Sequence, residues 1–360
     1  MSPSLRFPEF TGEWENKRIG DIGKFFSGGT PSSSRKDFYG GEIPFIRSGE
    51  IHSDKTELFL TQEGYKNSSA KMVEVGDILL ALYGANSGDI SISQMRGAIN
   101  QAILCIRTNV APVFFKSVWE KHAQKILNTY LQGGQGNLSA DIVKKITISI
   151  PSQIEQAKIA ALFSHLDERI SIQNRLIDRL QSLMIGIAQK IAHSNKPNVR
   201  ISDCLECSSS ALQESEVNKT GKYPVYGANG IVGYIDKYHT QNEAIYIIKD
   251  GSGVGGVSYV TGKCSSTGTL NILQAKNGHS LKYLYYLLKV FNFVPYKTGM
   301  AIPHIYFKDY GKAKIFCPAY PEQLEYAKLL SSIDGNLRIA MDSLKNFNLQ
   351  KQYLLRHMLI

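Results

Sequence analysis

The segment IPSQIEQAKIAALFSHLDERI, residues 150–170, returns in modified form as CPAYPEQLEYAKLLSSIDGNL, residues 317–337. An offset of 167 positions keeps several identical residues in register: Pro151 with Pro318, Glu155 with Glu322, Gln156 with Gln323, Ala160 with Ala327 and Asp167 with Asp334. The same register extends upstream without a gap to Leu138 and Ile305. An internal repeat of this extent indicates a chain built from two related halves.

Each copy carries mainly apolar residues at alternating steps of four and three, the a/d pattern of a coiled-coil seam. The first seam comprises Ile159, Phe163, Leu166, Ile170, Gln173, Ile177, Leu180, Met184, Ile187 and Ile191. The second comprises Tyr326, Leu330, Ile333, Leu337, Ala340, Leu344, Phe347, Lys351, Leu354 and Met358. Because no proline interrupts either seam, we predict helices near 152–192 and 319–359, each about 60 Å long.

Two seams of equal length at matched positions favour pairing with each other. The first helix leaves the first globular half and the second begins where the second half ends, so pairing along their full length requires antiparallel helices. This topology predicts two globular domains separated by the helix pair, related by a pseudo-two-fold axis, with both chain ends near one domain. The polar seam residues Gln173 and Lys351 are not explained by the pattern.

The two globular halves begin alike and then diverge. RIGDIGKFFSGGTP starts at Arg18, and RISDCLECSSSALQ starts at Arg200 after the polar linker HSNKPN. Short β-type runs broken by Gly, Asn and Ser follow in both, with helix-type segments at 113–131 and 281–293. The predicted fold class is therefore mixed α/β (α+β). The predicted domains are 1–150, a central helix 151–193, 194–317 and a distal helix 318–360.

Composition and charge narrow the class of protein. The 360 residues are 43% hydrophobic and 20% charged, as in soluble globular proteins, and no apolar run reaches the ~18 residues of a membrane span. A net charge of +10 favours a phosphate polymer as partner. The first residues lack an apolar signal region, so a bacterial or archaeal cytoplasm is expected. Reduced thiols are then expected at Cys105, Cys204, Cys207, Cys264 and Cys317.

The motifs of common catalytic and metal sites are missing or in the wrong context. GSGVGG, residues 251–256, matches a dinucleotide-binding pattern, but the β-type VSYVTGK that follows favours a glycine turn between strands. Cys204 and Cys207 form a C-x-x-C pair without a second pair at zinc spacing, so we expect structural thiols and no metal. No Walker loop and no methyltransferase or nuclease motif is evident, and the chain is predicted to be non-catalytic.

The repeat and two further segments resemble the specificity subunit of type I restriction-modification systems. LRFPEFTGEWENKRIGDIGKFFSGGTP, from Leu5, is similar to the usual start of such subunits. YPVYGANGIVGYIDKY, from Tyr223, is similar to a common opening of one type of target-recognition domain. The Pro…Glu-Gln…Ile-Ala…Leu-Asp pattern of the first helix resembles the family's central conserved region. The second helix matches more weakly, with Tyr326 and Glu325 where Ile159 and Lys158 stand in the first.

This resemblance implies that DNA recognition and catalysis reside on different subunits. Two target-recognition domains each read one half of a split site in double-stranded DNA. The helices set the spacing and bind two methyltransferase subunits, and restriction subunits complete an ATP-dependent nuclease. S-adenosylmethionine, Mg and ATP are then expected on partner subunits, with no cofactor in this chain and no membrane partner. Because the halves differ in sequence, we predict a bipartite, non-palindromic site.

Polar and basic residues in the glycine-rich loops are the candidates for base contacts, because Arg and Lys suit guanine whereas Asn and Gln suit adenine. In the first domain the candidates are Arg35, Lys36, Arg47, Ser48, Tyr83, Asn86, Arg96 and Gln101. In the second domain they are Tyr226, Asn229, Lys249, Ser252, Lys263, Thr267, Lys297 and His304.

Three other functions fit parts of the pattern. The chain could be a stand-alone or methylation-only DNA-binding protein without a nuclease partner, a cofactor-using enzyme built around GSGVGG, or a coiled-coil spacer without nucleic acid. Association with a methyltransferase subunit, binding of nicotinamide or flavin, and a steep salt dependence of DNA binding would separate them.

Overall fold

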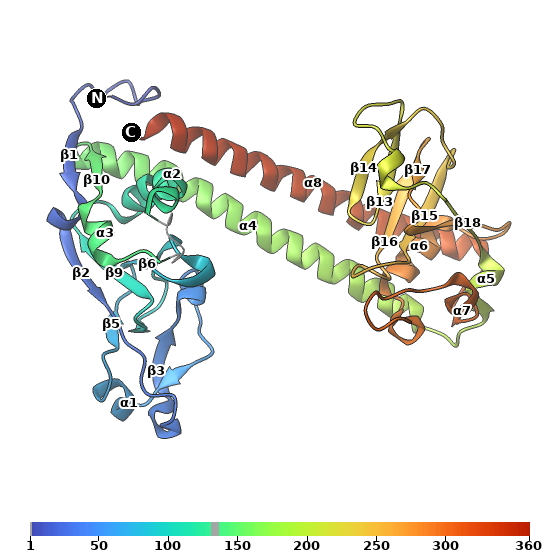
Figure 1. Ribbon diagram of the computed structural model, residues 1–360, viewed down its shortest axis with the longest axis horizontal. Helices are drawn as coiled ribbons and strands as arrows, with labels where there is room; N and C mark the ends of the chain where they lie inside the picture. The colour runs from blue at the N-terminus through green and yellow to red at the C-terminus, as the bar shows by residue number, and fades with distance from the viewer. Residues whose placement is uncertain (1, 131–136) are drawn as a thin grey trace. The chain divides into compact units, whose positions relative to one another are not determined.

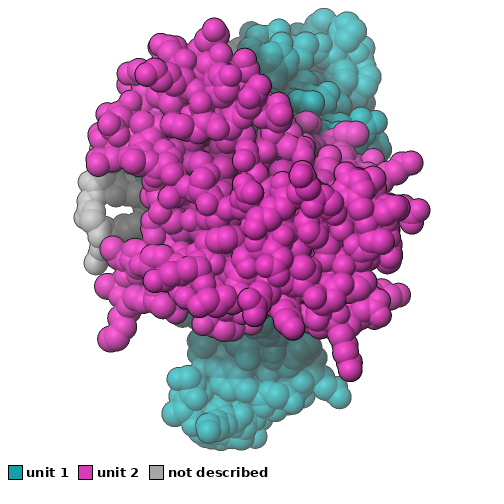
Figure 2. Space-filling model, turned by 90° about the vertical axis from the view of Figure 1, so that its right-hand side faces the viewer, with its two compact units in different colours: residues 1–173, 343–360 teal, residues 174–342 magenta. Residues whose placement is uncertain are grey.

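The chain folds into two compact units. The computed structural model describes residues 2–130 and 137–360 (Figure 1). Unit 1 comprises residues 1–173 and 343–360, and unit 2 comprises residues 174–342 (Figure 2). Unit 1 is therefore assembled from both ends of the sequence, and within it the backbone amide of Leu5 donates to the carbonyl of His357 at 2.9 Å.

Two long helices carry the repeated segment. Helix α4 spans Gln153–Ala192 and helix α8 spans Tyr320–Met358, so both predicted helices are confirmed. The boundary between the units falls inside both helices, and each unit holds part of each helix. The predicted four-part division follows the order of the chain, whereas these units follow contacts, so that division stays a prediction.

The predicted seam lies on the protected side of both helices. Within unit 1, Asp167 pairs with Lys351 and Arg169 lies over the ring of Phe347, so numbers fall along α8 as they rise along α4. The antiparallel direction is thus confirmed (Figure 1). The buried seam residues are Ile159, Phe163, Leu166, Ile177, Met184, Ile191, Leu330, Ile333, Leu337, Ala340 and Met358, and the others are half-buried.

Unit 1 contains a two-stranded ribbon and two four-stranded sheets. The ribbon pairs β1 (Glu15–Arg18) with β10 (Thr147–Ile150). The first sheet has the order β2 (Gly23–Ser27), β9 (Ile103–Thr108), β6 (Ile78–Ala81) and β7 (Ile90–Ile92). The second has the order β4 (Phe59–Leu60), β3 (Tyr39–Ile46), β8 (Gly97–Ile99) and β5 (Lys71–Val73). Its shorter helices are α1 (Gln62–Lys66), α2 (Pro112–Tyr130) and α3 (Ala140–Lys145).

Unit 2 contains a ribbon, a four-stranded sheet and a three-stranded sheet. The ribbon pairs β11 (Val199–Arg200) with β19 (Lys314–Ile315). The larger sheet has the order β12 (Leu205–Ser209), β18 (Leu270–Ala275), β15 (Glu243–Ile248) and β16 (Val257–Thr261). The smaller has the order β14 (Gly230–Ile235), β13 (Tyr223–Gly227) and β17 (Ser265–Ser266). Its shorter helices are α5 (Ile201–Cys204), α6 (Leu281–Val290) and α7 (Phe307–Tyr310).

The two units share one framework. The strand order β2-β9-β6-β7 corresponds to β12-β18-β15-β16, and the parallel pair β3–β8 corresponds to β13–β17. The amide of Ile19 donates to the carbonyl of Ile146 at 2.8 Å, and the amide of Ile201 donates to that of Ala313 at 3.0 Å. These two acceptors are related by the offset found in the helices. The repeat therefore extends from the helices into the backbone of both globular parts.

A buried glutamine fastens the first turn of each long helix to the unit in which that helix begins. The side chain of Gln156 accepts from the amide of Ala111 before α2 at 3.1 Å and donates to the carbonyl of Pro151 at 2.9 Å. Gln323 accepts from the amide of Ser280 before α6 at 2.8 Å, and donates at 2.8 Å to the proline carbonyl that opens its own segment. Both ends of each amide are satisfied, which gives the repeated glutamine a structural purpose.

Replacing either glutamine by leucine is expected to destabilise the unit in which the glutamine lies by about 1–3 kcal/mol, because a backbone amide and a backbone carbonyl beside the buried side chain lose their partner. Urea unfolding of the full chain, with hydrogen exchange assigned to each unit, measures the loss for Gln156→Leu and Gln323→Leu. Gln153→Leu changes an exposed residue of the same helical turn and should alter stability by less than about 0.5 kcal/mol. Equal losses from exposed and buried positions would contradict the anchoring role.

The outer faces of the long helices carry large apolar side chains. Ile172 and Leu349 are 48% and 53% exposed in unit 1, and Leu183 and Ile339 are 50% and 66% exposed in unit 2. Charged and polar residues separate them along the sequence. Among the helices that the structure describes, none has the length and apolar character needed to cross a membrane.

Candidate nucleic-acid interface

Three loops of unit 1 meet at the ends of its strands: 47–50, 83–86 and 100–102. The amide of Asn100 donates to the last carbonyl of β3 at 3.4 Å, and the amide of Leu82 donates to the loop 100–102 at 2.8 Å. Nδ2 of Asn86 lies beside Gly49, 3.5 Å from where a Cβ would stand. We call this group loop cluster 1. Its predicted contact residues are Arg47, Ser48, Tyr83, Asn86 and Gln101.

The neutral side chains of loop cluster 1 suit contacts with base edges. Asn86 is half-buried and Gln101 is exposed, and the hydroxyl of Thr30 donates to Oε1 of Gln101 at 2.5 Å. The ring of Tyr83 is 39% exposed, so it lies on the surface and not in the core. Amides and a phenol at one loop surface provide both donors and acceptors.

The three arginines predicted for the first domain are all paired with carboxylates. The pairs are Arg35 with Asp37 at 2.6 Å, Arg47 with Glu50 at 2.9 Å and Arg96 with Glu74 at 3.1 Å. The hydrogen bonds between Arg47 and Glu50 raise the pKa of the arginine and lower the pKa of the glutamate to about 2. The pairs Arg35–Asp37 and Arg96–Glu74 are exposed. Such pairs are worth about 0–1 kcal/mol, so a phosphate or a guanine can compete for these two guanidinium groups.

Three of the predicted residues lie apart from loop cluster 1. Arg35 and Lys36 lie next to α1, where Arg35 also approaches Glu63 at 3.7 Å, and Arg96 directly precedes β8. Within residues 2–130 and 137–360, none of the three forms a hydrogen bond or ion pair with a residue of the cluster. Their exposed charges suit contacts with the phosphate backbone better than readout of bases.

Two loops of unit 2 form a second group, which we call loop cluster 2. The loop 249–256 contains GSGVGG and joins antiparallel β15 to β16, so the predicted glycine turn between strands is confirmed. The loop 297–304 is bound to it, because Nδ1 of His304 lies 2.7 Å from Oδ1 of Asp250 and the amide of Gly251 donates to Pro303 at 3.0 Å. The predicted residues gathered there are Lys249, Ser252, Lys297 and His304.

The loop 297–304 also presents apolar residues that the sequence analysis missed. Met300 is fully exposed and Ile302 is 58% exposed. Gly299 has a φ of +89°, and a Cβ there would stand 2.3 Å from the carbonyl oxygen of Ile302, so this turn requires glycine. The signal in the sequence was a run of three apolar residues, 300–302, between a glycine and a proline, which by itself is equally typical of a core segment.

The remaining predicted residues of the second domain are spread over its smaller sheet. Tyr226 packs edge-on against Tyr246, and burial raises its pKa. Thr267 is buried and its hydroxyl lies 2.8 Å from that of Thr269. Asn229 is exposed in the turn from β13 to β14, and Lys263 lies 4.8 Å from a tyrosine ring. For every candidate in both domains, contact with DNA stays a prediction.

Lys351, which the heptad pattern left unexplained, belongs to a cluster of four charges in unit 1. Its Nζ lies 2.7 Å from Asp167 of α4 and 2.8 Å from Glu120 of α2. Lys116 of α2 lies at the same distances from the same two carboxylates. Burial by itself would raise the pKa of Asp167, but Lys116 and Lys351 lower it below its ordinary 3.8. The neutral cluster joins α2, α4 and α8.

One known protein family matches both halves of this chain. The model of the type I restriction modification DNA specificity domain matches residues 11–182 and, a second time, residues 194–346. The chain belongs to that family and contains its domain twice. The resemblance inferred from the sequence is thus confirmed.

Relatives of this chain include specificity subunits of archaeal and bacterial type I restriction enzymes. It is 28% identical over 185 residues to the MjaIX subunit of Methanocaldococcus jannaschii, covering 47% of this chain and 42% of that one. It is 28% identical over 188 residues to the HindI subunit of Haemophilus influenzae, covering 48% and 40%. The matched region therefore spans less than half the length of either relative.

Solved structures confirm the fold over the whole chain. The crystal structure of the S subunit of a type I restriction-modification system from M. genitalium matches with a TM-score of 0.73, covering 100% of this chain and 99% of that one at 17% identity. A chain from work on complex assembly and conformational transition of the type I R-M system matches with a TM-score of 0.51, covering 96% and 97% at 14% identity.

Proposed function

We propose that this chain is the DNA-specificity subunit of a type I restriction-modification complex and reads a bipartite, non-palindromic site. The observation that carries the proposal is one framework present twice with different loops. Equivalent sheets, ribbons and glutamine anchors support loop clusters 1 and 2, whose side chains differ. A conserved scaffold with divergent loops is what two related domains need to recognise two different targets.

The long helices provide the assembly surface in this proposal. They bind two methyltransferase subunits, and restriction subunits join that core. Support comes from the exposed apolar side chains on both helices in each unit, since an apolar patch among polar residues is typical of protein interfaces. Paired helices of fixed length also hold the two domains at one spacing along the duplex.

Catalysis resides on the partners in this proposal. S-adenosylmethionine, Mg and ATP act there, in the cytoplasm, while this chain positions the complex on DNA. The net charge of +10 supplies a sequence-independent attraction to the phosphate backbone, which loop contacts convert into specificity.

The proposal is tested by replacing residues 18–150 with a second copy of residues 200–317 of the same chain. Both junctions fall at equivalent positions of the repeat, so the framework should be preserved. In complex with its methyltransferase subunits, the duplicated chain is expected to methylate a palindromic site made of one half-site and its inverted copy. Single-molecule sequencing of methylated DNA reads the result.

A chain carrying residues 18–150 from another member of the family is the matched control, and it should change one half-site only. If the duplicated chain assembled but still methylated the original bipartite site, the two domains would not be the parts of the chain that recognise DNA sequence. If the control chain recognised DNA that differs in both half-sites, this would also contradict the proposal that each domain recognises one half-site independently.

A further inference from the structure

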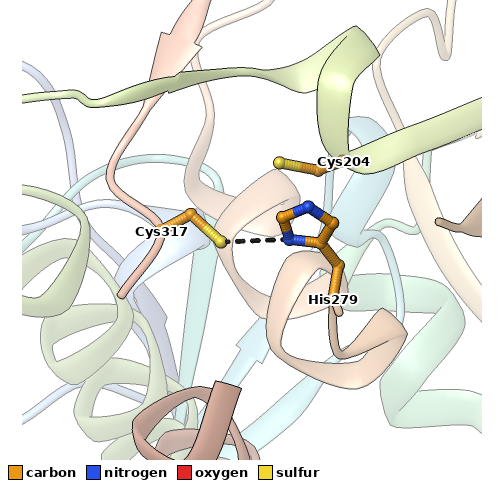
Figure 3. A group of neighbouring side chains, drawn as sticks. All are labelled: Cys204, His279 and Cys317. Carbon is orange, nitrogen blue, oxygen red and sulfur yellow. Dashed lines mark hydrogen bonds between the residues drawn. The ribbon is translucent and has the colours of Figure 1, made fainter. Parts of the chain in front are cut away.

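Three potential metal ligands meet inside unit 2 (Figure 3). Cys204 comes from α5, His279 from the loop before α6, and Cys317 from the segment that follows β19. Their ligand atoms all lie within 4.8 Å of one another, and Sγ of Cys317 is 3.6 Å from Nδ1 of His279. Both cysteines are buried and the histidine is half-buried.

The spacing of Cys317 and His279 fits a tetrahedral zinc site, and Cys204 lies within 4.8 Å of both. Zinc bonds of about 2.3 Å to sulfur and about 2.0–2.1 Å to nitrogen place a sulfur and a nitrogen ligand roughly 3.6 Å apart, and two sulfurs roughly 3.8 Å apart. The distance between Cys317 and His279 equals the first of these values. Two thiolates and an imidazole are also the donors that zinc prefers over hard cations.

The backbone around the three ligands is held in place. Asn198 donates to the carbonyl of Cys317 at 2.7 Å and accepts from its amide at 2.8 Å. The amide of Lys276 donates to the carbonyl of Cys204 at 2.9 Å, and the carbonyl of Lys276 accepts from the amide of His279 at 3.1 Å. Such support keeps ligands at a fixed geometry and lowers the cost of organising a site.

Unit 1 shows what the framework has at these positions when no ligand is needed. Aligning Arg18 with Arg200 places Ile22 opposite Cys204, and the offset of the helices places Ile150 opposite Cys317. Ala111 and Ser280 both donate to the anchoring glutamine, so the residues before them, Val110 and His279, also correspond. Ile22, Val110 and Ile150 line one cavity of unit 1. The framework therefore tolerates three aliphatic side chains where unit 2 has two thiols and an imidazole.

We infer that unit 2 binds one zinc ion through Cys204, His279 and Cys317. The ion fastens the first helix of the second domain to α6 and to the segment leading into α8. It acts as a structural clamp and leaves a fourth coordination position for water. From the C-x-x-C pair of Cys204 and Cys207 the sequence predicts structural thiols and no metal. Cys207 lies on β12, whereas the structure groups Cys204 with ligands that are distant in sequence.

The test uses the full reduced chain, purified without chelator, and measures zinc by mass spectrometry and cobalt by absorption. We expect one zinc per chain, and cobalt substitution should give the thiolate charge-transfer bands and intense visible bands of a tetrahedral site. Cys207→Ser is the matched control and should retain the metal. His279→Val should lower zinc affinity at least tenfold. The variant Cys204→Ile/His279→Val/Cys317→Ile, copied from unit 1, should remain folded and bind none.

Four results would overturn the inference. Three of them are a wild-type chain that takes up no cobalt with thiolate bands, a triple variant that retains as much zinc as the wild type, and a loss of metal in Cys207→Ser. Formation of a disulfide between Cys204 and Cys317 in the metal-free chain under air, with no zinc taken up after reduction, would also reject it. If the triple variant does not fold, the spectrum of the wild type and the affinity of His279→Val decide alone.

Discussion

A chain with Asn86 and Gln101 both replaced by alanine is expected to lose nearly all methylation of its cognate sites while still assembling with its partners. A well-formed amide contact to a base contributes about 1–3 kcal/mol of discrimination, so loss of two weakens recognition by roughly 30-fold to 10⁴-fold. Both residues lie on loop cluster 1 and belong to neither of the long helices. Competition binding with cognate DNA and with DNA scrambled in one half-site measures the effect.

The matched control is Arg35→Ala/Lys36→Ala, which changes two exposed residues outside loop cluster 1. These residues are expected to contact phosphates, so their loss should weaken binding to all sequences equally and reduce the salt slope by up to about 2. Two results would contradict base recognition by loop cluster 1. One is that Asn86→Ala/Gln101→Ala still discriminates cognate DNA from scrambled DNA, and the other is that the control variant loses this discrimination.

Replacing Asp167 by leucine is expected to destabilise unit 1 by about 2–4 kcal/mol. The change leaves two lysines facing one carboxylate, and breaking a buried ion pair in this way is costly because a charge loses its partner. The expected loss is below that of a fully buried pair, because the side chain of Asp167 is 33% exposed. Unfolding of the full chain in urea, followed by exchange of the α2 amides, measures it.

The double variant Asp167→Leu/Lys351→Met restores neutrality and is expected to recover more than about 1 kcal/mol of the loss. Additive losses in the double variant would show that the four charges are not coupled. The pH dependence gives a further check. Because the pKa of Asp167 is lowered in the folded chain, its contribution is complete above 3.8 and is lost as the pH falls through the lower folded value. The advantage of the wild type over Asp167→Leu should therefore vanish in acid.

The helices were predictable because their signal is local and periodic. Seam residues such as Phe163 and Leu330 recur at heptad spacing, and burial of one face follows from that spacing alone. Lys351 could not be explained in the same way, because its partners Glu120 and Asp167 come from two other helices. Pairing along one helix is visible in sequence, whereas pairing among three helices is a property of the fold.

The sequence indicated which residues are candidates for DNA contacts, but not which of these residues lie together in the folded chain. Glycine-rich loops identified Arg47, Asn86 and His304 as candidates, yet which loops meet depends on how the strands pair. Cys204 illustrates the same limit, since its nearest cysteine in sequence is Cys207 while its neighbours in space are His279 and Cys317. Sequence spacing reports a shared site only when the ligands lie on one element.

Unit 2 interrupts unit 1 in the chain, and this has a consequence for the order of synthesis. Residues 343–360 leave the ribosome after the whole of unit 2, and they supply Lys351 to the charge cluster and the Leu359 carbonyl that accepts from Lys121. The domain translated first is thus completed last. A prematurely ended chain would carry a finished second domain and a first domain with exposed core and unbalanced charge, a form that proteases and chaperones distinguish from the complete one.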